Sequence, residues 1–216
     1  MTSRDLRNAL LTAVAADLLP FGFMLNRAQA EFTQRTPDGW NKVQLVFLWR
    51  NPEWEIKAGL LIRLHRVEQL YHRASSFDPK YHGTTPTVGL PVEKLLAEGQ
   101  ATHMTLRTAA DLAPCRAWVE RLFAKWARPF FARYHDLAAL EHEVNAPPGT
   151  GLFSGPKYEG NVGLILAKLV DSPAYDQLQQ RYQRHYEWLS NGFYLPEYEK
   201  LLKILEEAEV SDAMKG

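Results

Sequence analysis

Two short stretches of the chain carry the residue types of a metal-dependent hydrolase. Asp38 belongs to the first stretch, and Glu55 and Lys57 stand two positions apart in the second. Residues two apart on a strand point to the same face of the sheet, so Glu55 and Lys57 would lie side by side. Two carboxylates can hold a divalent metal ion, and a neighbouring lysine can help to activate a water molecule. Asp38, Glu55 and Lys57 are therefore candidate catalytic residues.

The order Pro37-Asp38, then Glu55-Ile56-Lys57, resembles the Pro-Asp…(Asp/Glu)-x-Lys pattern of the restriction-endonuclease-like nucleases. The resemblance is confined to residues 37–57. It implies that Asp38 and Glu55 would hold a divalent metal ion and that Lys57 would assist the attacking water. A metal-dependent nuclease or other hydrolase that uses Glu55 and Lys57 is therefore the alternative function for this chain.

A structural explanation competes with this function. Thr36-Pro37-Asp38-Gly39 is a strong turn signal, and Glu55 and Lys57 fit the solvated face of a sheet. In the strand register given below, Asp38 lies at the opposite end of a hairpin from Glu55. At roughly 3.3 Å per residue, strands of this length separate the two carboxylates by tens of ångströms. The hydrolase would need Asp38 or Asp78 close to Glu55, and we favour the structural explanation.

The stretch 40–65 predicts the hairpin that positions these residues. Apolar residues alternate with others along both arms, as is typical of half-buried strands: they are Val43, Leu45, Phe47 and Trp49, then Trp54, Ile56, Ala58, Leu60, Ile62 and Leu64. Asn51-Pro52 marks the turn, and because proline cannot adopt a positive φ, we expect a four-residue loop at 50–53. This register places Trp49 opposite Trp54 and both apolar sets on one face. The other face carries Lys42, Gln44, Glu55, Lys57 and Arg63.

The rest of the chain predicts a helix-rich half after the sheet. Before the hairpin we expect a helix from Thr2 or Ser3 to about Leu19 and short strands at 21–27 and 29–35. After it we expect a helical segment at 66–73, a long loop at 74–92, a short helix at 92–98 and a fifth strand at 102–107. Further helices are predicted at about 108–129, 136–144, 161–171, 173–191 and 196–209, with a second long loop at 145–160.

These elements predict one α+β domain over residues 1–216. It is sheet-rich up to residue 107 and helical from residue 108, with an N-terminal helix and an antiparallel β meander of four to five strands. The helical C-terminal half is expected to pack on one face of this sheet, because each element must bury its apolar side.

Composition narrows the class of protein. The 216 residues contain one cysteine, Cys115, which excludes an internal disulfide and fits a reducing compartment such as the cytoplasm. Basic and acidic residues balance at 25 each, which argues against duplex DNA or an anionic membrane as the main partner. No apolar run is long enough for a membrane span. No metal-binding, phosphate-binding or nucleophile motif stands in the sequence, so we expect no metal and no cofactor.

The N-terminal layout resembles certain bacterial domains of unknown function, some of which accompany polymorphic toxins and are taken as immunity proteins. The shared features, over about residues 4–70, are an initial helix, a Phe21-Gly22-Phe23 entry into a sheet, and a meander that ends at Ile62-Arg63-Leu64. The resemblance implies a cytoplasmic protein that works by binding, and it assigns no functional residue.

We therefore expect a non-enzymatic protein-binding module, with toxin neutralisation as its narrower form. The partner is expected to be a protein rather than a membrane or a nucleic acid, and self-association into a homo-oligomer stays open. The expected binding residues lie on the polar face of the hairpin and are Lys42, Gln44, Lys57 and Arg63. The loops 74–92 and 145–160 offer further recognition surface. Aromatic side chains between Tyr175 and Tyr198 could anchor a partner.

Overall fold

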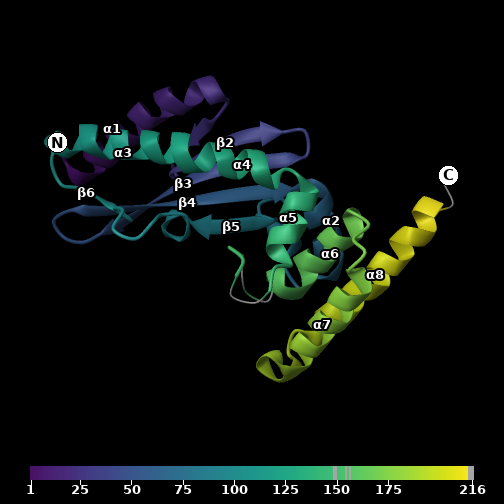
Figure 1. The fold of residues 1–216 in the computed structure, drawn as a ribbon. Helices are drawn as coiled ribbons and strands as arrows, with labels where there is room; N and C mark the ends of the chain where they lie inside the picture. Colours follow the sequence, from purple (N-terminus) through teal and green to yellow (C-terminus); the bar gives the residue numbers. More distant parts are fainter. Residues whose placement is uncertain (148–149, 154, 156, 214–216) are drawn as a thin grey trace. The chain divides into compact units, whose positions relative to one another are not determined.

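The computed structural model describes residues 1–147, 150–153, 155 and 157–213 (Figure 1). It confirms the α+β class, because an N-terminal helix precedes an antiparallel sheet and the second half of the chain is helical. The chain forms two compact units. Unit 1 comprises Met1–Ile62 and Gly89–Ala132, and unit 2 comprises Arg63–Val88 and Arg133–Gly216. The chain therefore passes between the units three times, whereas the sequence places its change from strands to helices near residue 108.

Helix α1 (Ser3–Leu18) opens unit 1 close to its predicted bounds. The Thr2 hydroxyl accepts from the backbone N–H of Asp5 at 3.1 Å, and the Asp5 carboxylate accepts from the N–H of Thr2 at 2.9 Å. This reciprocal capping box satisfies two N–H groups that the start of a helix leaves without partners. One side of α1 is buried and contains Leu6, Leu10, Leu11, Val14 and Leu18. The helix packs against α3 (Leu112–Leu122).

The described chain contains a six-stranded sheet, with β1 (Met24–Asn26), β2 (Glu31–Thr36), β3 (Gly39–Trp49), β4 (Trp54–Leu64), β5 (Val88–Pro91) and β6 (Met104–Leu106). The strand order is β1-β2-β3-β4-β5, and β6 pairs with β4. β1 to β4 therefore form the predicted meander, and β6 confirms the strand expected at 102–107. The loop predicted at 74–92 was wrong at its end, where β5 lies. Four residues that contain a glycine and a proline are too short to show the alternation of a strand.

The β3–β4 hairpin has the predicted four-residue loop, 50–53. The N–H of Arg50 donates to the Glu53 carbonyl at 2.8 Å, and the Asn51–Pro52 peptide is cis. The ring centroids of Trp49 and Trp54 lie 5.0 Å apart, as the predicted register requires. The expected apolar face is buried at Val43, Leu45, Ile56, Ala58, Leu60, Ile62 and Leu64, whereas Trp49 is 45% exposed beside the loop. The burial is therefore complete in the middle of the sheet and fades at the hairpin tip.

The helix predicted at about 108–129 continues past Pro129 to Tyr134. It consists of the turn Ala109–Asp111, α3, the wide turn Phe123–Ala127 and α4 (Arg128–Tyr134). Within the wide turn the N–H of Arg128 donates to the carbonyl of Phe123, five residues back. Because Pro129 has no N–H, a local change to this π-type pattern just before it lets the chain stay helical.

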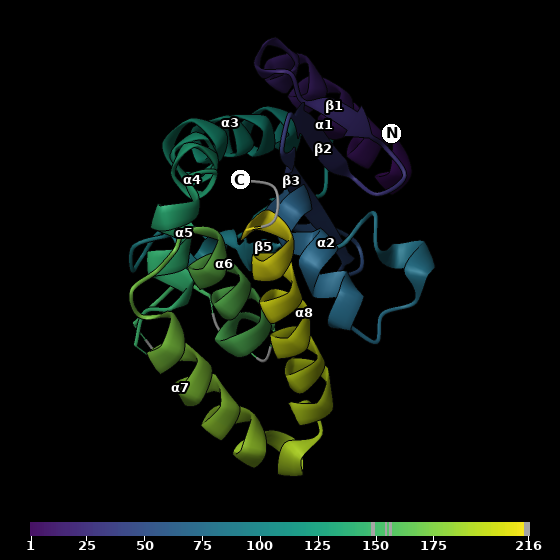
Figure 2. The same ribbon diagram turned by 90° about the vertical axis from the view of Figure 1, so that its right-hand side faces the viewer.

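Unit 2 is built from α2 (His65–Ala74), α5 (Leu137–Val144), α6 (Gly163–Leu169), α7 (Tyr175–Trp188) and α8 (Leu195–Ala213). Helix α6 contacts α2, α5 and α7, and α8 packs against α2 and α7 (Figure 2). The core between them includes Val67, Leu164, Tyr186 and Tyr198, all fully buried. The other described elements of both units are short helical turns, at Leu19–Phe21, Pro79–Tyr81, Val92–Lys94, Lys157–Val162 and Leu189–Gly192. In the predicted loop 145–160, residues 148, 149, 154 and 156 lie outside the described part.

Candidate functional site

The structure does not bring the candidate catalytic residues together. Asp38 lies in the tight turn that joins β2 to β3, whereas Glu55 lies at the start of β4, paired with Thr105 of β6. Strand β3 has 11 residues, so roughly 30 Å separate its two ends at about 3.3 Å per residue. Asp78, the other candidate carboxylate, caps the turn Pro79–Tyr81 and pairs with Lys80 at 2.9 Å.

Glu55 and Lys57 form a group of ion pairs on the sheet instead. The Nε of Arg50 donates to Glu55 Oε2 at 3.1 Å, and this bond holds the pKa of Glu55 below its usual value. Lys57 Nζ lies 3.6 Å from carboxylate oxygens of both Glu55 and Glu93. Across the described residues, no three His, Cys, Asp or Glu side chains are grouped so that they could hold a metal ion. These surroundings match the structural explanation for Glu55 and Lys57.

The predicted binding residues on the hairpin are largely engaged within the chain. Lys42 Nζ lies 2.8 Å from a carboxylate oxygen of Glu31 and 4.4 Å from the centre of the Trp40 ring. Gln44 Nε2 donates to the same Glu31 carboxylate at 3.4 Å. Lys57 is more accessible, with 40% of its side chain exposed. The polar face of the hairpin therefore offers little unpaired charge to a partner.

The expectation that Arg63 lies open on this face was wrong, because its side chain is only 6% exposed. Its guanidinium donates to the backbone carbonyls of Thr85 and His82, the second at 2.6 Å, and to the Thr85 hydroxyl at 2.9 Å. The alternation along β4 does place Arg63 on the polar side, but the segment 82–85 covers that end of the strand. The guanidinium of Arg63 therefore bonds to groups within the protein and is not exposed to a partner.

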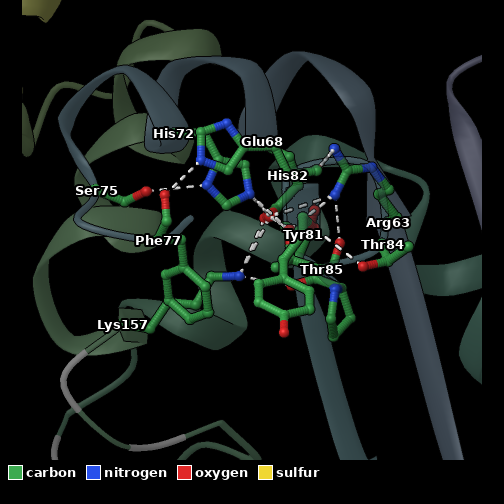
Figure 3. Close-up of polar contacts among 12 residues, drawn as sticks. Arg63, Glu68, His72, Ser75, Phe77, Tyr81, His82, Thr84, Thr85 and Lys157 are labelled. Carbon is green, nitrogen blue, oxygen red and sulfur yellow. Dashed lines mark hydrogen bonds and ion pairs between the residues drawn. The ribbon is translucent and has the colours of Figure 1, made fainter. Parts of the chain in front are cut away.

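Arg63 belongs to a buried polar cluster centred on Glu68 of α2 (Figure 3). This group, the Glu68 cluster, consists of Arg63, Glu68, His72, Thr85 and Lys157. The Glu68 side chain is fully buried, and its carboxylate lies 3.5 Å from Arg63 Nη1 and 3.2 Å from Lys157 Nζ. The Thr85 hydroxyl donates to the same carboxylate at 2.6 Å. Two cations therefore face one buried anion.

Lys157 has partners besides Glu68. Its ammonium donates to the Pro86 carbonyl at 2.6 Å and lies 4.7 Å from the centre of the Tyr71 ring. Burial lowers the pKa of Lys157 and of Arg63, and the charge of Glu68 opposes this effect in both. Because buried charges are tolerated only with such partners, the cluster fastens α2 to the segments that carry Thr85 and Lys157.

The ring of His72 is held between two hydroxyl groups. Nδ1 lies 2.9 Å from Ser75 Oγ, and Nε2 lies 2.6 Å from Thr85 Oγ1. Since the Thr85 proton is donated to Glu68, the Thr85 oxygen must accept from His72 Nε2–H, and Nδ1 accepts from Ser75. Burial, the ring of His82 stacked at 4.0 Å and the neighbouring cations lower the pKa of His72 to about 4. His72 is therefore neutral at physiological pH.

Ser75, His72 and Glu68 follow the order of a serine nucleophile, its base and an orienting carboxylate. Their surroundings do not suit catalysis. The charge of Glu68 is already matched by two cations, and a histidine with a pKa of about 4 is a weak base. The N–H of Ser76, which follows the serine, donates to Glu197 at 3.0 Å and is not available to an oxyanion. Ser75, His72 and Glu68 instead belong to a structural hydrogen-bond chain in which the Thr85 hydroxyl links His72 to Glu68.

Unit 2 also contains a pocket of about 640 Å³, the aromatic pocket, beside this cluster. The pocket lining includes Lys157, which is a member of the Glu68 cluster, and Ser75, whose hydroxyl bonds to His72 of that cluster. The walls are aromatic or apolar and include Tyr71, Phe77, Tyr186, Phe193, Tyr194 and Pro196. Phe77 is 48% exposed and Phe193 is 75% exposed. The volume falls within the range of ligand sites, about 300–1,000 Å³, so the pocket is an accessible apolar site.

Asn161 and Glu197 supply polar groups to the aromatic pocket. Asn161 is 4% exposed, and its Nδ2 donates to Glu197 Oε1 at 3.0 Å. Glu197 Oε2 accepts from the N–H and the hydroxyl of Ser76, at 3.0 and 3.2 Å. The Oδ1 of Asn161 has no hydrogen-bond partner among the described residues. A buried amide oxygen normally accepts a hydrogen bond, and Asn161 Oδ1 is an exception to this rule within the described residues.

The backbone beside Asn161 is shaped to fit the ring of Tyr186. Gly160 has a φ of +152°, and a Cβ at this position would collide with that ring. Burial raises the pKa of Tyr186 and of Tyr71, so both phenols stay protonated. The walls of the pocket are therefore neutral rings, and its charges come from lysines and Glu197.

Comparison with protein-family models, curated proteins and solved structures found no match for this chain. Within the described ranges, every helix is too short or too polar to cross a bilayer. The sequence offered one local signal for the Glu68 cluster, since Glu68 and His72 stand four apart on a helix and so share a face. It offered none for Lys157, which lies in the predicted loop 145–160, or for Asn161, the first residue of the helix predicted at 161–171.

Proposed function

We propose that this chain is a non-enzymatic binding protein that takes a segment of a partner polypeptide into the aromatic pocket. The observation that carries the proposal is the unpaired Oδ1 of buried Asn161 at a pocket with exposed aromatic walls. An unpaired buried acceptor and exposed apolar rings are both unfavourable in the free protein. A bound polypeptide relieves both at once, because it brings an N–H donor and an apolar side chain.

The walls of the pocket favour an apolar side chain of the partner. Phe77, Phe193 and Tyr194 are each more than one-third exposed, and they surround the same space. Aromatic residues of this kind anchor protein interfaces, and the area that they bury contributes roughly 25 cal/mol per Å². An aromatic or branched aliphatic side chain is therefore the complement that the pocket selects.

The polar part of the pocket favours a neutral donor. Lys157 and Lys200 line the same space as Glu197, so a cationic group would meet two like charges. A main-chain N–H carries no charge and would satisfy Asn161 Oδ1 without this repulsion. The preferred ligand is therefore a peptide segment rather than a free amine.

The narrower form of this proposal is that the partner is a toxin, as the N-terminal layout of residues 4–70 suggests. Cys115 is 1% exposed and stands alone, which supports work in a reducing compartment such as the cytoplasm. The first point concerns the kind of partner and the second the compartment in which binding would take place. Neither changes the chemistry proposed for the aromatic pocket.

The test is selection of peptides from a random display library against the full chain and two matched variants. Phe193→Ala removes a wall of the aromatic pocket, whereas Trp188→Ala removes a side chain that is 85% exposed and lies outside the described lining. Selected peptides should carry apolar side chains and bind wild type and Trp188→Ala equally. Phe193→Ala should bind them at least about tenfold more weakly, as expected for an aromatic anchor.

A second readout locates the peptide. The side-chain amide NMR signals of Asn161 should shift on peptide binding, because the peptide donates to Asn161 Oδ1. Failure to select any peptide would contradict the proposal. So would peptides whose binding is weakened equally by the two variants, because exposed aromatic surface in general would then be responsible.

A further inference from the structure

A second pocket in unit 2, of about 830 Å³, lies between residues of α5 and α7 and is lined by charged side chains. Three arginines belong to its lining, Arg133, Arg181 and Arg184, together with Glu141 and Glu143. Counting these groups alone, the pocket carries one net positive charge. We refer to it as the arginine pocket.

Arg181 is fixed in position within this pocket. Its two terminal nitrogens each lie 3.2 Å from the Asn145 carbonyl oxygen, and one of them also donates to the Tyr182 hydroxyl at 2.6 Å. A guanidinium has five N–H groups in a rigid fork, so these bonds leave N–H groups for a further acceptor. Arg181 is therefore a donor group that is ordered before any ligand arrives.

Arg184 stands three residues later, on the same side of α7. Its Nε donates to the Gln180 carbonyl of the same helix at 3.2 Å. Its terminal nitrogens form no hydrogen bond or ion pair with any residue that the structure describes. An arginine fork without a carboxylate partner lines the pocket.

The two glutamates of the pocket are occupied by groups of the protein. Glu143 accepts from the N–H of Leu152 at 2.8 Å and lies 3.5 Å from Arg133 Nη2. Glu141 accepts from Asn145 Nδ2 at 2.8 Å. Glu143 is therefore paired with Arg133, whereas Glu141 keeps its negative charge and bonds to a neutral amide. Arg184 has no carboxylate partner among the described residues.

We infer that the arginine pocket binds a phosphate group. The planar guanidinium fork matches the oxygens of a phosphate, and charge-assisted bonds of this type are the strongest hydrogen bonds in proteins. The volume is large enough for an organic molecule that carries the phosphate. The site belongs to a different set of residues from the aromatic pocket, so it does not depend on the proposed peptide binding.

The test is calorimetric titration of the full chain with inorganic phosphate and with ribose 5-phosphate, at constant ionic strength. Wild type should bind at least one of the two. Tighter binding of ribose 5-phosphate would identify an organic phosphate as the ligand, and equal binding would identify the free ion. Arg184→Gln should weaken binding at least about tenfold, the effect of losing a charge-assisted bond.

Arg66→Gln is the matched control. Arg66 is an exposed arginine of α2, also in unit 2, and lies outside the described lining of the arginine pocket. The Arg66→Gln variant should bind the phosphate ligands as wild type does, and far-UV circular dichroism should show that both variants are folded. Absence of binding to wild type overturns the inference. So does an equal loss in Arg184→Gln and Arg66→Gln, because the attraction would then come from general positive charge.

Discussion

Glu68→Gln tests whether the Glu68 cluster holds unit 2 together. The substitution keeps the size of the side chain but removes the only carboxylate of the cluster. Arg63 and Lys157 would then remain buried without their shared anion, at sites now 3.5 and 3.2 Å from a neutral amide. The amide would also turn an N–H₂ group toward a cation or toward the Thr85 hydroxyl, which now donates to the carboxylate.

The expected loss of stability follows from this geometry. Removing one partner of a buried ion pair costs about 3–5 kcal/mol, because an uncompensated charge stays behind. Lys157→Met should cost less, since the Lys157 side chain is 23% exposed and the fully buried Glu68 keeps Arg63 as its partner. The double variant should lose less than the sum of the two single variants, by about 1–3 kcal/mol of coupling.

Urea unfolding followed by circular dichroism measures these changes. With a slope of roughly 2–3 kcal/mol per M, Glu68→Gln should lower the midpoint by about 1–2 M. Glu55→Gln is the control, because the partly exposed ion pairs of Glu55 with Arg50 and Lys57 should contribute at most about 1 kcal/mol. If Glu68→Gln and Glu55→Gln have the same midpoint, the Glu68 cluster does not stabilise the fold and the reasoning is refuted.

Two further predictions concern buried titratable groups. His72 stays neutral in the folded chain down to about pH 4, whereas the unfolded chain protonates it below about pH 6.5. The unfolded state then binds more protons, so the free energy of unfolding should fall by about 3 kcal/mol on acidification from pH 6.5 to pH 4. Denaturant titrations should show that wild type loses more stability than His72→Gln between pH 6.5 and pH 4, whereas the exposed His65→Gln, the control, should behave as wild type. Equal pH dependence of wild type and His72→Gln would contradict the lowered pKa of His72. Cys115 is buried and donates to the Thr105 carbonyl, and burial raises the pKa of its thiol to about 11. A thiol-disulfide reagent should therefore label it at least about a hundredfold more slowly in the native chain than in urea, and equal rates would show an accessible thiol.

The local features of this chain could be read from its sequence. The stripe of α1 and its Thr2 cap depend on residues within one or two turns of each other, and the structure confirms both. The hairpin loop at 50–53 depends on Pro52 and on alternation along two adjacent arms. Patterns of this kind repeat at the period of the backbone, so burial follows the sequence directly.

The errors arose where a segment distant in sequence decides the outcome. Arg63 has the strand position of an exposed residue, but the segment 82–85 covers it and supplies its acceptors. Strand β5 is recognisable only by its pairing with β4, because its own four residues contain a glycine and a proline. Pro129 stands within a helix because a wide turn precedes it.

The sequence by itself determined the α+β class, the hairpin and the buried face of its first helix, since these need only local periodicity and turn chemistry. The tertiary structure alone decided the candidate sites. Lys157 meets Glu68 across 89 positions, and Asn161 meets Glu197 across 36. Ionisable and amide side chains acquire their roles from burial and from partners, and neither is encoded within a short window of the chain.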